Sequence, residues 1–101
     1  MHVDFASTEL QLLYTDNVGA DTYTAETVKL FRRRVRQIEA ANSMRDVQSL
    51  RCARYKQIGI ATPLKASLAL NGPWSLIITE EDRAGIQTMV ITEIAELAGS
   101  E

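Results

Sequence analysis

Hydrophobic residues recur with two different periods along this chain, and the change of period divides it into a helical first half and a strand-rich second half. Val3 and Phe5 alternate with polar neighbours, which predicts a short strand over residues 2–5. Ser7 or Thr8 can then cap a helix that runs to about Tyr14. Turn-forming residues at 16–19 separate this helix from a longer one.

The longest predicted helix covers about residues 25–41 and begins after Thr24, a suitable N-cap. Its apolar residues follow one another at spacings of three and four, which predicts one buried stripe made of Val28, Phe31, Val35 and Ile38. The remaining faces of the helix are basic and carry Arg32, Arg33, Arg34 and Arg36. A short helical turn near residues 45–50 is expected next.

The second half predicts strands joined by short connections. We expect a basic strand at 51–57, a loop to 63, a hairpin of strands 65–70 and 74–79, a charged turn at 80–85 and a strand at 86–94. This order predicts an α+β fold in which two N-terminal helices pack on one face of a small curved antiparallel sheet. The strand residues expected in the core are Leu68, Leu70, Trp74, Leu76 and Ile77.

The length and composition bound the class of protein. A chain of 101 residues is enough for one core, so we treat 1–101 as a single domain. It has no apolar run near the roughly 18 residues of a membrane helix and no signal-peptide pattern. With its single cysteine, Cys52, we expect a cytoplasmic protein. Zinc-ligand spacing, a glycine-rich phosphate loop and a nucleophile elbow are missing from the sequence, so we expect no metal and no cofactor.

The net charge of −2 conceals a strong asymmetry. Residues 1–27 carry five acidic side chains and no Lys or Arg, and residues 58–101 carry six acidic side chains against two basic ones. Residues 28–57 carry nine basic side chains against two acidic ones. Such a block predicts binding to phosphates or to an acidic protein surface, and a solvated helix face explains it equally well.

Four motifs, in this order, resemble the RelE/HigB (plasmid maintenance killer) toxins. A Val3-Asp4-Phe5-Ala6-Ser7 start precedes a Leu-rich helix, and the second helix contains Glu26-Thr27-Val28-x-x-Phe31-Arg32-Arg33-Arg34. Arg45-Asp46-x-x-Ser49-Leu50 follows, and the hairpin contains Ser67-Leu68-x-Leu70-Asn71-x-x-Trp74-x-Leu76-Ile77. The resemblance covers nearly the whole chain and implies a type II toxin that cleaves mRNA on the ribosome and is neutralised by a separately encoded antitoxin.

The resemblance also implies candidate site residues. Arg54 and Lys56 match the family's basic strand, where a spacing of two predicts a common face. Glu96 corresponds to the acidic position of the family's C-terminal Asp-Tyr-His, so Arg54, Lys56 and Glu96 are the candidate catalytic residues. The candidate RNA-binding residues are Arg51, Arg54, Lys56 and Lys65.

Two positions depart from the family pattern. The hairpin arginines that face RNA in the family correspond to Ala69 and Ser75 here. Cleavage of RNA through its 2′-hydroxyl needs fixed positive charge at the developing phosphorane, and each lost donor costs on the order of 10²–10³ in rate. We therefore expect weak cleavage or none. This leaves two hypotheses: a weakly active mRNA interferase, or a non-catalytic RelE-like protein that binds an antitoxin, the ribosome or RNA.

Overall fold

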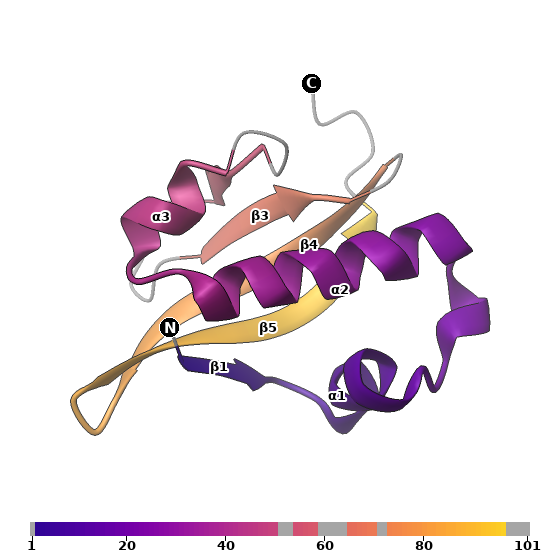
Figure 1. Ribbon diagram of the computed structural model, residues 1–101, viewed down its shortest axis with the longest axis horizontal. Helices are drawn as coiled ribbons and strands as arrows, with labels where there is room; N and C mark the ends of the chain where they lie inside the picture. Colours follow the sequence, from indigo (N-terminus) through magenta and orange to yellow (C-terminus); the bar gives the residue numbers. More distant parts are fainter. Residues whose placement is uncertain (1, 51–53, 59–64, 71–72, 97–101) are drawn as a thin grey trace.

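Helices and strands follow one another in the order β1-α1-η1-α2-α3-β2-β3-β4-β5 (Figure 1). The computed structural model describes residues 2–50, 54–58, 65–70 and 73–96. The elements are β1 (His2–Phe5), α1 (Thr8–Asp16), the 3₁₀ turn η1 (Ala20–Thr22), α2 (Ala25–Ala40), α3 (Met44–Gln48), β2 (Lys56–Ile58), β3 (Lys65–Ala69), β4 (Trp74–Arg83) and β5 (Ile86–Glu96). The chain is thus an α+β fold, as predicted.

The strands form one five-stranded sheet in the order β1-β5-β4-β3-β2. The neighbours β2–β3, β3–β4 and β4–β5 are antiparallel, whereas β1 runs parallel to β5. The prediction of a purely antiparallel sheet was therefore wrong at this pair. The period-two pattern of β1 fixes which side chains face the core, but it carries no information about the direction of the neighbouring strand.

Local capping chemistry sets the ends of the two long helices. The Ser7 hydroxyl oxygen accepts a hydrogen bond from the Leu10 N–H at 3.3 Å, so Ser7 rather than Thr8 is the N-cap of α1. Thr24 caps α2 as predicted, accepting from the Thr27 N–H at 3.1 Å. Asn17 ends α1 in the left-handed conformation, with φ of 61°, which asparagine tolerates better than most residues.

The core lies between the helices and one face of the sheet. All four residues of the predicted α2 stripe are buried, and Phe31, Val35 and Ile38 are completely inaccessible. They form one cluster with strand residues that include Leu68, Leu76, Ile78, Met89 and Ile91. In Figure 1, α2 lies across β4 and β5. The helix stripe was therefore predicted correctly.

Trp74 and Ile77 lie differently from the other strand residues predicted for the core. Trp74 packs against the edge of this core, half-buried, with its ring edge-on to Tyr23 at 5.2 Å between centroids. Ile77 is 3% exposed but does not belong to the core cluster beneath the helices. It lies on the opposite side of the sheet, because its neighbours Leu76 and Ile78 both enter the core.

The charged stretch predicted as a turn at 80–85 is mostly strand. β4 continues to Arg83, and the connection to β5 is the pair Ala84 and Gly85, both at positive φ. The Asp82 carboxylate accepts from the Gly85 N–H at 2.9 Å and so stabilises the tight turn. The charged residues belong in strands because Glu80 to Arg83 pair with β5 over the whole length of the hairpin.

A β-bulge interrupts the β4–β5 pairing. Ile77 lies opposite Glu93 and Ile78 lies opposite Ile91, so Thr92 is the extra residue on β5. The Thr92 hydroxyl donates to the Ile77 carbonyl oxygen at 2.8 Å. After Thr92, each side chain of β5 therefore projects to the face opposite the one that strict alternation from Ile91 would give it.

None of the described helices is long and apolar enough to cross a membrane. The longest, α2, has 16 residues and buries one stripe while its other faces carry charge.

Candidate nucleic-acid interface

The face of the sheet opposite the core, called the far face here, carries the positions that the resemblance to RNA-cleaving toxins singles out. Strand register defines it, because paired residues of neighbouring strands project to the same side. On β3 and β4 the far face contains Lys65, Ser67, Ala69, Ser75, Ile77 and Thr79. On β2 it contains Lys56 and Ile58, and on β5 it contains Val90, Glu93 and Ala95.

Lys56 and Lys65 are brought together on this face. Lys56 pairs with Ser67, and Lys65 stands two residues before Ser67 on β3, so the two lysines are diagonal neighbours. Such a pair is separated by about 7–8 Å at the backbone. Both side chains are exposed, and neither forms an ion pair with a described residue. Two free ammonium groups at this spacing suit contact with neighbouring phosphates.

Arg54 does not share the strand that was predicted for it. β2 begins at Lys56, and Arg54 lies in a turn before it with φ of 47°. The alternation argument that placed Arg54 and Lys56 on a common face therefore fails. Arg54 is exposed close in sequence to Lys56, and Arg51 lies outside the described residues.

Ala69 and Ser75 are direct partners across the β3–β4 ladder, and Ser75 in turn pairs with Ala95. The resemblance places the family's two RNA-facing arginines at this pair. Lys65 stands four residues earlier on β3, about 13 Å away at the rise of a strand. It therefore cannot restore at Ala69 the charge that the pair lacks.

The bulge decides which carboxylate shares this face. Glu96 pairs with Trp74, which packs on the core side, so Glu96 lies on the helix side of the sheet. Glu93 pairs with Ile77 and projects, exposed, on the far face. The sequence analysis named Glu96 and not Glu93, and the part of Glu96 in catalysis stays a prediction. The strand pattern alone gives no sign of the one-residue insertion at Thr92.

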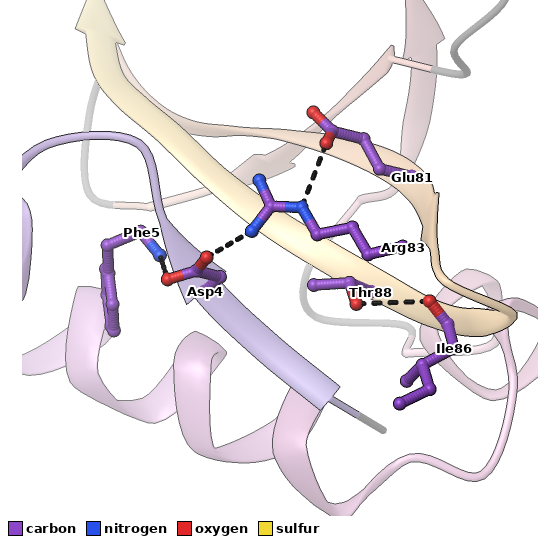
Figure 2. A network of polar contacts seen from close by, with 6 residues as sticks. All are labelled: Asp4, Phe5, Glu81, Arg83, Ile86 and Thr88. Atoms are coloured by element: carbon purple, nitrogen blue, oxygen red, sulfur yellow. Dashed lines mark hydrogen bonds and ion pairs between the residues drawn. The ribbon is translucent and has the colours of Figure 1, made fainter.

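The opposite end of the far face is occupied by an ion-pair network, drawn in Figure 2. The Arg83 guanidinium on β4 reaches across β5, bonds the Asp4 carboxylate on β1 and donates from Nε to Glu81 at 3.1 Å. The Phe5 N–H and then Arg83 hold the pKa of Asp4 below its ordinary value. Because two carboxylates neutralise it, Arg83 is not a free cation for a phosphate.

The arginines of α2 do not form one uniform solvated face. Arg34 is 4% exposed and donates from Nε to the Ala69 carbonyl oxygen at 3.1 Å, so its predicted place on an open face was wrong. Arg32 is half-buried and donates to the Leu13 carbonyl oxygen and to the Asn17 side chain. Arg33 and Arg36 are exposed, as predicted.

The accessible chemistry of the far face is thus Lys65 at one end of β3, the neutral pair at the other end, Lys56 diagonal to both Lys65 and Ala69, and one carboxylate nearby. Glu93 is diagonal to Ser75 across β4 and β5 and can serve as a general base. The Ala69–Ser75 pair carries no charge of its own, and Lys56, diagonal to Ala69 across β2 and β3, is a described cation at about 7–8 Å from it at the backbone. Among these residues, no three His, Cys, Asp or Glu side chains gather to hold a metal ion.

No protein-family model, no curated protein and no solved structure gives a significant match to this chain. The resemblance to the RelE/HigB toxins accordingly rests on the sequence motifs given above.

Proposed function

We propose that this protein is a RelE/HigB-type toxin-like protein that binds RNA on the ribosome through the far face and cleaves it weakly or not at all. The observation that carries the proposal is the arrangement of that face. Lys56 and Lys65 are exposed diagonal neighbours, while Ala69 and Ser75 lie paired and uncharged. The two lysines can position a nucleic acid by contacting its phosphates. The uncharged pair supplies no positive charge to stabilise the transition state of cleavage.

The proposal assigns different roles to the residues named from the sequence. Lys56 and Lys65 hold the RNA backbone, with Arg54 at the margin. Glu93 replaces Glu96 as the carboxylate that can reach a substrate on this face. As the resemblance implies, the partners are the ribosome with its mRNA and a separately encoded antitoxin. The cytoplasm is the compartment expected from the sequence pattern and the single cysteine.

The alternative is a non-catalytic binding protein, and the neutral Ala69–Ser75 pair is the observation that favours it. An acid beside two uncharged positions repels a phosphate as negative charge builds up in the transition state. Binding by two lysines does not depend on that pair. Both functions therefore predict RNA binding, and only the first predicts cleavage of the RNA.

The test is cleavage and binding with ribosomes programmed by a defined mRNA. Ribosome association should fall for Lys56→Ala combined with Lys65→Ala, and the salt dependence of RNA binding should become shallower by about 0.7–0.9 per lysine on a log–log plot. Lys29→Ala on α2 removes one charge from the other side of the molecule and serves as the control. Mapping of mRNA 5′ ends decides between slow cleavage and none. Ribosome and RNA binding that is unchanged in the double variant contradicts the proposal.

A further inference from the structure

A hollow of about 470 Å³ lies between α1, the connection from α1 to α2, and β5. It exists because β1 pairs with β5 only as far as Ile91, and the chain then leaves the sheet for α1 (Figure 1). Among the described residues, no strand lies beside Thr92 to Ile94 on this edge of β5, and α1 and the connection wall the gap instead. It is called the α1 hollow here, and its volume lies within the range of small-molecule sites.

Most of the surface inside the α1 hollow is apolar. Leu10, Leu13 and Ile94 are buried and connect this surface to the core. Val18 also lines the hollow, although it is 55% exposed, which is unusual for a large apolar side chain of this protein. A ligand with an aliphatic or aromatic group would remove this surface from water, which is favourable.

The charge of the α1 hollow is negative. Glu9 on α1 and Glu93 on β5 both line it, and none of the described lining residues is Lys, Arg or His. Both glutamates are exposed, and neither forms an ion pair with a described residue. Ser7, Thr22 and Thr92 add hydroxyl groups to the lining, and hydroxyl oxygens can accept further hydrogen bonds. The hollow therefore combines an apolar surface with two carboxylates that no described cation neutralises.

We propose that the α1 hollow binds a small organic cation, an amine whose protonated ammonium group carries an aliphatic or aromatic tail. The ammonium group donates to the carboxylates of Glu9 and Glu93, and the tail lies against Leu10 and Ile94. A metal ion fits less well, because among the described residues no three His, Cys, Asp or Glu side chains gather. A phosphate group is repelled by both carboxylates. This inference shares Glu93 with the RNA-binding function but does not depend on that function.

The probe is n-hexylammonium, a primary amine with a straight apolar tail, added to the isotope-labelled full chain. Binding is followed by amide chemical shifts in two-dimensional NMR spectra, which also show whether each variant is folded. The shifts should be largest in the first turn of α1 and at residues 92–94, and they should saturate with a Kd on the order of 1 mM. Hexanol has the same tail without the charge and should bind about tenfold more weakly, since it lacks the attraction to two exposed carboxylates. Methylammonium has the charge without the tail and should not saturate the site.

Two pairs of variants test the two parts of the lining. Glu9→Gln should weaken binding about threefold, because one exposed ion pair is lost. Glu26→Gln is its matched control, since Glu26 is exposed and is also the second residue of its helix but does not line the hollow. Val18→Ser should also weaken binding, whereas Ile86→Ser removes an equally exposed apolar side chain outside the hollow and should leave binding unchanged.

Three outcomes would overturn the proposal. Equal losses for Glu9→Gln and Glu26→Gln would show that diffuse negative charge attracts the amine. Hexanol that binds as tightly as n-hexylammonium would show that the hollow selects apolar groups and not cations. Shifts that do not saturate, or that lie outside the hollow, would show that it is not an amine site. Lys56→Ala combined with Lys65→Ala should leave amine binding unchanged, so a failure of RNA binding and a failure of this inference can be told apart.

Discussion

Arg34 on α2 donates from Nε to the backbone carbonyl oxygen of Ala69 at the end of β3, across 3.1 Å. The same guanidinium bonds Gln37 one turn along the helix and is almost completely buried. A buried charge is tolerated only when it is hydrogen-bonded. The contact therefore ties the middle of α2 to the strand end that carries one of the two neutral far-face positions.

We expect Arg34→Ala to lower the free energy of unfolding by about 2–3 kcal/mol, because a hydrogen bond made by a charged donor is lost and side-chain packing goes with it. Arg33→Ala, an exposed neighbour on the same helix, should change it by less than about 0.5 kcal/mol. Urea denaturation measures both. Similar values for the two variants would show that the Arg34 contact contributes little.

Stability should fall as acid protonates Asp4. Its pKa in the folded protein lies below the ordinary value of 3.8, owing first to the Phe5 N–H and then to Arg83. The stabilisation is therefore present above that value and is lost as the pH falls through the lower, folded pKa. Asp4→Asn should lose less stability than wild type between neutral pH and pH values below 3.8, measured by urea midpoints. Parallel curves for the two proteins would contradict this linkage.

The bulge at Thr92 provides a third prediction. Thr92→Val removes the hydroxyl that donates to the Ile77 carbonyl oxygen and should lower the free energy of unfolding by about 1 kcal/mol. Thr79→Val is the control, since Thr79 is also half-buried in the sheet but makes no side-chain hydrogen bond with a described residue. If both variants unfold at the same urea concentration, the hydroxyl does not stabilise the bulge.

Restoring charge at the neutral pair tests the catalytic argument. Ala69→Arg combined with Ser75→Arg should raise ribosome-dependent mRNA cleavage by at least about tenfold, since each oxyanion donor contributes on the order of 10² to a rate. Full activity is not expected, because His2 is the only histidine and lies at the far end of the sheet on β1.

The double glutamine variant, Ala69→Gln with Ser75→Gln, controls for side-chain size without adding charge. Circular dichroism checks that two arginines placed directly opposite each other leave the sheet folded, since like charges at paired positions are destabilising. If the arginine variant is folded and binds ribosomes but cleaves mRNA no better than the glutamine variant, the missing positive charge does not explain weak cleavage.

The sequence was most informative where structure depends on neighbours along the chain. Thr24 and the apolar stripe of α2 could be placed correctly, because capping and the 3.6-residue period are local properties. The hairpin strands around Trp74 were identified for the same reason. The parallel pairing of β1 could not be predicted, since it depends on a strand far away in sequence.

The candidate site was harder to predict because it depends on register. One inserted residue, Thr92, moves Glu96 away from the far face and brings Glu93 onto it, although both look alike in the sequence. Arg34 illustrates a second difficulty. Composition treats it as one of a run of solvated arginines, and only the position of the Ala69 carbonyl shows that it is buried.

The parallel pairing of β1 with β5 has a consequence for how the protein is made. His2 lies beside Thr88 and Phe5 beside Ile91, so the pairing joins segments more than eighty positions apart. Closing so long a loop costs conformational entropy, which is offset only by the interactions of the complete sheet. Contacts between segments so far apart in the sequence slow folding. During synthesis β1 has no partner until β5 has left the ribosome, and α1 and α2 meanwhile lack most of the sheet face that they cover. We therefore expect folding to wait until β5 has emerged, with an exposed apolar helix face as the intermediate that a chaperone would meet.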